Sequence, residues 1–449
     1  MTYLIIGTSN TIRRDGYRMF AEALRPDLPW RIEGVGATPS ALVPYILADL
    51  ALEDVTHVAI DTLINDSVLA SDAGSNIQAC EAMLFECVEW LQAHGKVVVL
   101  LLLPQTNKGE AAALLRRRRL AFAAARGIQV VDGYAVDDAM RRDFGMDDAQ
   151  LYTDPQHSTW PISLILGQRL LAAFGAGSAT AVAADAGPLP YFVHQLAKTA
   201  AHQVDRETSL TKRTYAALGE AESLEFHLAA PATLQALALN ARETSGILEI
   251  TSESGSVTQD LQTPHAAGGK STSAMIHLLL PLDKPLSGQS FRITLRRPDR
   301  QKEPVVAEIE SALFRWDAVP NNDAAREAEI EVGLAALTEF ETPALSPAES
   351  AIANAAMISW NQVDTSDAAA FYRRTFARPT PFWELAGHQI AVRIVDFGMV
   401  LGEHMAARRI LQSALKQFPR VQSLRDRLPD LRDKTRSART PTDPLDAAD

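Results

Sequence analysis

The sequence has few cysteines. Only two occur among the 449 residues, Cys80 and Cys87, on a segment with helical spacing. At about 1.5 Å per residue they stand roughly 10 Å apart along the helix axis, which is too far for a disulfide. We therefore expect two small core residues in a reduced protein.

The sequence also lacks a long apolar run. No stretch approaches the roughly 20 apolar residues of a membrane span, and the N-terminus has neither the basic nor the apolar segment of a secretory signal. We expect a cytoplasmic protein. Acidic residues outnumber basic ones, 55 to 43, giving a net charge of -12, which argues against nucleic acid or an anionic membrane as the main partner.

Several enzyme signatures are missing as well. The chain has no Walker loop, no glycine-rich dinucleotide fingerprint and no GxSxG elbow of the α/β-hydrolases. No close cluster of histidine, cysteine and carboxylate residues has metal-site spacing. We therefore expect no cofactor and no metal.

The most informative stretch lies at the N-terminus. Tyr3 to Ser9 is a mainly apolar run, too short for a helix and without polar alternation, which favours a parallel strand buried on both faces. Gly7 lets the chain turn, so Ser9 should stand at the carboxyl end of the strand, where open α/β sheets present catalytic side chains. Ser9 is a candidate nucleophile, although Gly-Thr-Ser-Asn is also an ordinary turn composition.

Two candidate partners of Ser9 lie far along the chain. Asp154 and His157 are three residues apart on a segment that Pro155 keeps out of a helix. Across such a turn the carboxylate can reach the near ring nitrogen of the imidazole and leave the far nitrogen facing outward, as a Ser-His-Asp relay requires. A lone histidine is more often structural, so this interpretation depends on the three residues together.

The sequence resembles the SGNH, or GDSL-type, hydrolases. Four segments fit the blocks of that family in the family's order: GTSN near the N-terminus, GVGAT (Gly34 to Thr38), LIND (Leu63 to Asp66) and DPQH. The resemblance covers about residues 1–175. Two positions differ from the family pattern, because Thr8 stands in place of an aspartate and Leu63 in place of a glycine. Neither position supplies the nucleophile, the base or an oxyanion donor.

The resemblance implies a role for each matching residue. Ser9 would be the nucleophile, His157 the general base and Asp154 its orienting partner. The backbone N–H groups of Ser9 and Gly36 and the side-chain amide of Asn65 would form the oxyanion hole.

Each of these blocks also has a purely structural interpretation. GVGAT could be a strand-to-helix turn that Thr38 caps and Pro39 opens, and Asn65 could form an Asx turn. Asp66 fits a helix or turn cap. The arginine run 116–119 is expected to be mostly a solvated surface, with a patch for an anionic substrate or partner as the alternative.

The first 175 residues predict an α/β fold. Strand-like and helical runs alternate up to Asp154, as in a parallel, doubly wound sheet of SGNH or flavodoxin-like type. The expected strands are the run from Tyr3, Trp30 to Val35, Val55 to Ile60, Lys96 to Leu103, and Gly127 to Val131. Ser9, Gly36, Asn65 and the loop 154–157 would then share one edge of the sheet.

The pattern changes after residue 175. Residues 176–204 are expected to be a linker. Short alternating runs, among them Leu224 to Leu228 and Leu234 to Leu239, predict a β-sandwich-like domain at 205–318. Helical spacing predicts an α-helical domain at 319–432, including a helix at 368–376, and the polar tail 433–449 is expected to be disordered.

These patterns predict a serine hydrolase acting by acyl transfer, and the resemblance makes small acyl esters, such as O-acetyl groups on carbohydrates, the leading substrate class. One alternative is acyl transfer to a sugar hydroxyl by the same triad. Another is a non-catalytic SGNH-fold scaffold acting through its C-terminal domains. The expected partner is an acyl-ester or glycan substrate, and the helical C-terminal region is a candidate surface for a homo-oligomer or a protein partner.

Overall fold

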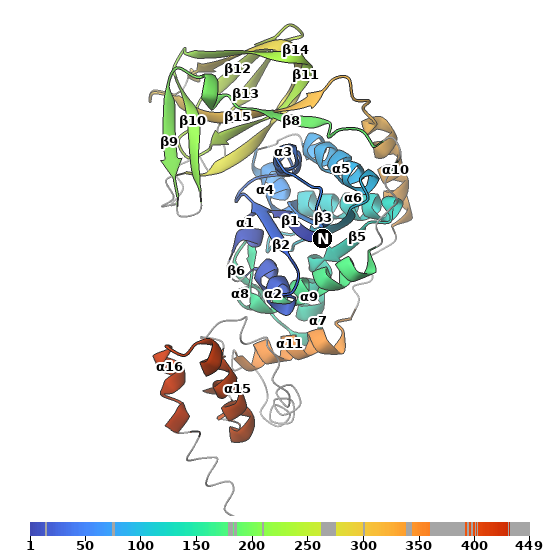
Figure 1. Ribbon diagram of the computed structural model, residues 1–449, viewed down its shortest axis with the longest axis vertical. Helices are drawn as coiled ribbons and strands as arrows, with labels where there is room; N and C mark the ends of the chain where they lie inside the picture. The colour runs from blue at the N-terminus through green and yellow to red at the C-terminus, as the bar shows by residue number, and fades with distance from the viewer. Residues whose placement is uncertain are drawn as a thin grey trace, which may run out of the picture.

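The computed structural model describes residues 1–13, 16–73, 77–177, 183, 186–208, 211–261, 275–299, 301–337, 344–359, 391–392, 395–396, 398–399, 401, 403–429 and 431. They form an α/β domain, an antiparallel β domain and a set of C-terminal helices (Figure 1). The predicted fold class is therefore confirmed. Within these residues, no helix is long and apolar enough to cross a membrane.

The N-terminal domain is built on a five-stranded parallel sheet with the order β2-β1-β3-β4-β5. This is the flavodoxin-like order, in which the carboxyl ends of the strands form the ligand edge. The strands are β1 (Thr2–Gly7), β2 (Trp30–Gly34), β3 (Val55–Asp61), β4 (Val97–Leu102) and β5 (Gln129–Asp132). Each overlaps a run expected from the sequence.

Helices cover both faces of this sheet. They are α1 (Ser9–Ile12), α2 (Tyr17–Leu24), α3 (Leu42–Ala48), α4 (Leu63–Ala73), α5 (Ile77–Ala93), α6 (Glu110–Arg126), α7 (Gly133–Phe144), α8 (Asp148–Leu151) and α9 (Trp160–Ala176). Alternate residues of β1 enter different cores: Ile5 packs with α2, α7 and α9, whereas Leu4 and Ile6 pack with α3, α5 and α6. Burial on both faces explains why the strand is apolar without alternation.

The second domain is one eight-stranded antiparallel sheet, which confirms the antiparallel β prediction. Its strands are β8 (Tyr191–His194), β9 (Gln203–Glu207), β10 (Lys212–Gly219), β11 (Ser223–Asn240), β12 (Ile247–Ser252), β13 (Gly255–Asp260), β14 (His277–Arg296) and β15 (Val306–Trp316). Since β8 pairs with β15, the sheet begins inside the segment expected to be a linker.

Two expected strands of this domain are parts of one longer strand. The runs 224–228 and 234–239 both lie in β11, which continues between them through a register shift from His227 to Ala232 against β14. An irregularity of this kind bends a strand without ending it. The interval 229–233 contains Pro231 and therefore looked like a turn in the sequence, and the prediction of two separate strands was wrong.

The C-terminal helices are α10 (Asp323–Ala336), α11 (Pro347–Ser359), α15 (His404–Gln417) and α16 (Gln422–Arg425). Of these, α10 and α11 pack on the α/β domain, whereas α15 and α16 pack against each other (Figure 1). Ile330 of α10 joins the apolar core under α6, and Ala353 of α11 joins the core under α9. The expected helix at 368–376 and the expected disordered tail at 433–449 lie outside the described residues.

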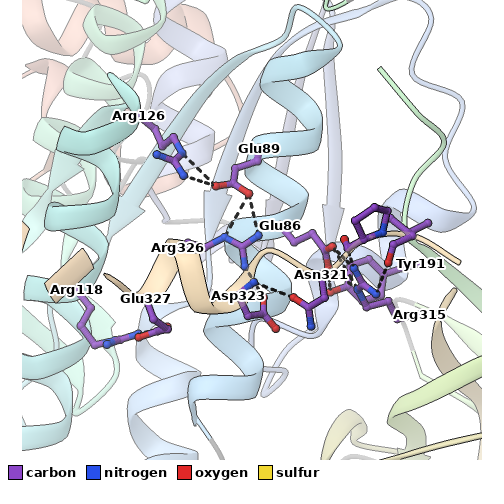
Figure 2. A network of polar contacts seen from close by, with 12 residues as sticks. Glu86, Glu89, Arg118, Arg126, Tyr191, Arg315, Asn321, Asp323, Arg326 and Glu327 are labelled. Carbon is purple, nitrogen blue, oxygen red and sulfur yellow. Dashed lines mark hydrogen bonds and ion pairs between the residues drawn. The ribbon is translucent and has the colours of Figure 1, made fainter. Parts of the chain in front are cut away.

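Ion pairs hold the β domain and α10 against α5 (Figure 2). Glu86 of α5 accepts hydrogen bonds from Arg315 Nη2 at 2.7 Å and from the Tyr191 hydroxyl at 2.5 Å. Glu89, one turn further along α5, binds Arg326 of α10 at 2.8 Å and Arg126 of α6 at 2.9 Å. The side chains of these pairs are between 3% and 27% exposed, and charged hydrogen bonds that are buried or partly buried fix the relative position of the elements they join.

Candidate active site

Ser9 begins α1 at the carboxyl end of β1, as the sequence predicts. The turn between them is tight at Gly7. A Cβ added to Gly7 would lie 1.9 Å from Thr11 Oγ1, so only glycine lets α1 fold back against the end of the strand. This turn presents Ser9 at the edge of the sheet.

The structure brings together Ser9, His157 and Asp154, which are distant in the sequence. His157 Nε2 lies 2.8 Å from Ser9 Oγ, and His157 Nδ1 lies 2.8 and 2.7 Å from the two carboxylate oxygens of Asp154. An ionised carboxylate can only accept, so Nδ1 carries the proton and Nε2 is left to accept from the Ser9 hydroxyl. This arrangement suits proton transfer from Ser9 to His157.

A two-stranded hairpin, β6 (Tyr152–Asp154) and β7 (His157–Ser158), supports the histidine and the aspartate. Its tip is held from two sides. Asn10 Nδ2 donates to the Gln156 carbonyl at 3.0 Å, and the Thr106 N–H donates to the Pro155 carbonyl at 3.0 Å. Sequence reasoning missed the role of Asn10, because its partner is 146 positions away and nothing local indicates the contact.

The surroundings of Asp154 favour its charged form. Burial raises its pKa, but the Gln156 N–H at 3.0 Å, the hydrogen bond to His157 and the charge of Arg13 together hold the pKa below its ordinary value. Arg13 Nη1 lies 3.7 Å from Asp154 Oδ2. No motif in the sequence points to Arg13, which lies four residues beyond Ser9 in the chain.

The glycine block lies beside Ser9. A Cβ built on Gly36 would lie 3.9 Å from the Ser9 Cβ, an ordinary contact distance. Ala37 has a left-handed φ of 62°, which is uncommon for a residue with a side chain and is often found near functional sites. Gly36 and Ser9, two of the expected oxyanion donors, are therefore neighbours.

Thr38 does not cap the following helix, so that structural interpretation was wrong. Helix α3 begins only at Leu42, and its N-cap is Ala41. The Thr38 hydroxyl lies 3.3 Å from the carbonyl oxygens of both Gly36 and His277. It therefore links the glycine block to the first residue of β14, so the hydroxyl that was expected to cap a helix instead contacts the β domain.

Asn65 lies in the first turn of α4 and is 5% exposed. Its Nδ2 donates to the Thr38 carbonyl at 3.1 Å. An amide nitrogen has two N–H groups, so this bond leaves one for another acceptor. Among the described residues, no hydrogen bond joins Asn65 to Ser9, and the direct partner of Asn65 is the glycine block.

Two arginines of the run 116–119 are buried, so the expectation of a mostly solvated surface was wrong for them. Arg119 is 2% exposed and forms an ion pair with Asp66, which also accepts from the Ser40 N–H at 2.7 Å. Arg118 binds Glu81 at 2.5 Å and Glu327 at 2.8 Å. The carboxylates that compensate this burial come from distant segments, which the sequence pattern cannot show.

A further carboxylate, Asp61, is fully buried at the end of β3. The Thr11 hydroxyl donates to its Oδ2 at 3.2 Å, and its Oδ1 has no hydrogen-bond partner among the described residues. Burial raises the pKa of Asp61 to about 7, although the hydrogen bond from Thr11 and the charge of Arg119 oppose the shift. Asp61 thus supports α1, the helix that begins with Ser9.

No protein-family model and no curated protein matches this sequence. Among solved structures, the chain is similar to a two-domain esterase (CEX) active on acetylated mannans, with 14% identity and a TM-score of 0.48, over 71% of this chain and 92% of that chain. It is also similar to a catalytic mutant of Axe2, an acetylxylan esterase from Geobacillus stearothermophilus. There the identity is 18% and the TM-score 0.32, over 39% of this chain and 94% of that chain.

Proposed function

We propose that this protein is a serine hydrolase of SGNH type that cleaves small acyl esters through Ser9, His157 and Asp154. The observation that supports this proposal most directly is the hydrogen-bonded chain from Ser9 Oγ through the imidazole to the Asp154 carboxylate, with distances of 2.8 Å and 2.7 Å. A serine in such a chain has the base and the orienting group that nucleophilic catalysis needs.

In the first half of the reaction, His157 Nε2 takes the proton of the Ser9 hydroxyl while Oγ bonds to the ester carbonyl carbon. The tetrahedral intermediate then collapses, the bond to the alcohol oxygen breaks, and His157 returns the proton to that oxygen. The products of this half are the free alcohol and an acyl group on Ser9.

In the second half, water gives a proton to His157 and its oxygen bonds to the acyl carbon. The bond from that carbon to Ser9 Oγ breaks, and His157 returns the proton to Oγ. The acyl group leaves as a carboxylic acid. Asp154 stays ionised throughout and stabilises the imidazolium that forms in each half.

The negative oxygen of each tetrahedral intermediate needs hydrogen-bond donors. We assign these to the backbone N–H groups of Ser9 and Gly36 and to the Asn65 amide. The proximity of Gly36 to Ser9 supports this assignment. Asn65 is held beside the glycine block by its hydrogen bond to the Thr38 carbonyl. Its side chain would therefore lose little conformational entropy when it binds the oxyanion.

For the substrate, we propose O-acetyl groups on carbohydrates. The sequence blocks around Ser9, Gly36, Asn65 and the Asp154–His157 pair support this class through their resemblance to SGNH hydrolases. Hydrolysis is the simplest outcome for an acyl-Ser9 intermediate to which water has access.

A fluorophosphonate probe tests the activated serine. We expect the intact mass of the wild-type protein to rise by one probe adduct, and that of Ser9→Ala to stay unchanged. The wild type should also release acetate from 4-nitrophenyl acetate and glucose pentaacetate. A folded wild type that forms no adduct and hydrolyses neither ester would refute the proposal and favour a non-catalytic scaffold.

A further inference from the structure

A cavity of about 670 Å³ lies between the glycine block and the β domain. Pockets of this size hold drug-sized ligands. Its walls are Ile12 and residues 32–37 on the α/β side, and Thr208, Thr211, Arg213 and residues 275–277 on the β-domain side. Gly36 borders both this cavity and Ser9, so the cavity adjoins the candidate nucleophile. In Figure 1, β9 and β10 extend toward α1 at this place.

Polar contacts hold the two walls of the cavity together. The Thr38 hydroxyl lies 3.3 Å from the His277 carbonyl, and the Tyr45 hydroxyl donates to Glu310 Oε2 at 2.6 Å. Glu310 in turn binds Arg213 Nη1 at 2.7 Å. Because these contacts are buried or nearly so, the cavity is formed before any ligand enters it, which lowers the entropic cost of binding.

Two side chains in the wall have buried nitrogen atoms without a hydrogen-bond partner among the described residues, Arg213 Nε and His277 Nε2. His277 is 5% exposed. Its Nδ1 lies 3.1 Å from the Tyr215 hydroxyl, while its Nε2 lies 3.6 Å from Glu310 Oε2, beyond hydrogen-bond distance. Buried polar atoms are rarely left unpaired in native proteins unless water or a ligand satisfies them.

The charges of this wall favour a neutral ligand. Arg213 is already paired with Glu310, so no cation among the described lining residues is left unpaired to attract an anion. Burial, together with the charge of Arg213, lowers the pKa of His277 and so favours the neutral ring. Apolar side chains, among them Ile12, Ile32 and Ile276, also line the cavity. A ring that carries hydroxyl groups suits this wall. Its hydroxyls can hydrogen-bond to Arg213 Nε and His277 Nε2, and its C–H groups can pack against the apolar side chains.

We infer that this cavity receives the alcohol part of the ester, a neutral polyhydroxylated group about the size of one or two sugar rings, and that Arg213 and His277 bind its hydroxyls. The inference rests on the proposed function, because the alcohol part is defined by the bond that Ser9 attacks. The β domain then forms half of the substrate site, and its role is to select the alcohol, whereas the α/β domain provides the acyl chemistry.

The test compares kcat/KM for 6-O-acetylglucose, whose alcohol part is a sugar with free hydroxyls, with kcat/KM for 4-nitrophenyl acetate, whose alcohol part carries no other hydroxyl. Thr211→Trp narrows the cavity from an exposed position, so the fold should tolerate it. We expect the ratio of the two values, sugar ester over aryl ester, to fall at least tenfold. The matched control is Thr258→Trp, which adds the same side chain at an exposed position of β13 outside the cavity and should leave the ratio unchanged.

A second variant tests recognition by the arginine. Arg213→Lys keeps a positive charge for Glu310 but removes the Nε–H group, so KM for the sugar ester should rise about tenfold with a smaller change in kcat. Equal ratios for the wild type and Thr211→Trp would overturn the inference while leaving the esterase proposal intact. Failure of the wild type on both esters, without a fluorophosphonate adduct on Ser9, would overturn both.

Discussion

At the scale of single residues, the most unusual group is Asp61. It is fully buried, one of its oxygens has no partner among the described residues, and its pKa is raised to about 7 by burial. In the unfolded chain an aspartate titrates near 4. The native protein therefore keeps the Asp61 proton to a higher pH than the unfolded chain does. This contribution to stability is complete below about pH 4 and is lost as the pH rises toward 7.

Asp61→Asn should remove this pH dependence, because an amide keeps a hydrogen-bonding group at the site and does not ionise. The free energy of unfolding of the variant, relative to wild type, should increase by roughly 3 kcal/mol from pH 5 to pH 8. Urea denaturation at the two pH values measures this difference. The control is Asp49→Asn at an exposed position, and parallel pH curves for wild type and Asp61→Asn would contradict the prediction.

At the scale of elements, two glycines position the serine turn and the glycine block for different reasons. Gly7 has no room for a side chain, since its Cβ would lie 1.9 Å from Thr11 Oγ1, and Thr11 is itself buried and bonded to Tyr17 and Asp61. Gly36 has space, with its nearest neighbours at 3.9 Å. One glycine is thus needed to form the turn, and the other keeps the approach to Ser9 open.

Alanine at the two positions should therefore have unequal effects on stability. Gly7→Ala should lower the free energy of unfolding by about 1–3 kcal/mol, the usual cost of forcing an extra methyl group into a packed site. Gly36→Ala should change it by no more than about 0.5 kcal/mol. Urea denaturation of the two variants, each serving as the other's control, measures the contrast, and similar losses would show that Thr11 can move aside.

At the scale of the whole molecule, the α/β domain and the β domain share an apolar core. Leu4 and Ile60 of the parallel sheet belong to the same buried cluster as Ala238 and Leu313 of the β domain and Ile330 of α10. The Glu86–Arg315 pair lies at this boundary, with each side chain 11% exposed. We therefore expect the two domains to unfold together.

Arg315→Met should destabilise this boundary strongly, because it leaves Glu86 buried without its cation. Breaking a buried pair in this way costs roughly 3–5 kcal/mol. Arg292→Met is the matched control, since it removes an arginine from the exposed Arg292–Glu225 pair, for which a loss below about 1 kcal/mol is expected. Thermal unfolding of both variants gives the comparison, and equal shifts would mean that the boundary contributes little to stability.

The sequence by itself determined the features that depend on near neighbours. The apolar run before Gly7 indicates a buried strand, Pro155 keeps the Asp154 segment out of a helix, and the alternation of strands and helices fixes the ligand edge. From these, the meeting of Ser9 with His157 across 148 positions followed through the expected topology. The roles of these residues in catalysis remain a proposal.

Only the tertiary structure decided which distant groups compensate one another. The burial of Arg119 depends on Asp66, and the position of the glycine block depends on His277, 239 positions beyond Thr38. The continuity of β11 through its bend depends on pairing with β14 and β15. Such contacts join segments whose local patterns are each compatible with an exposed surface or a turn, so their energies appear only when the chain has folded.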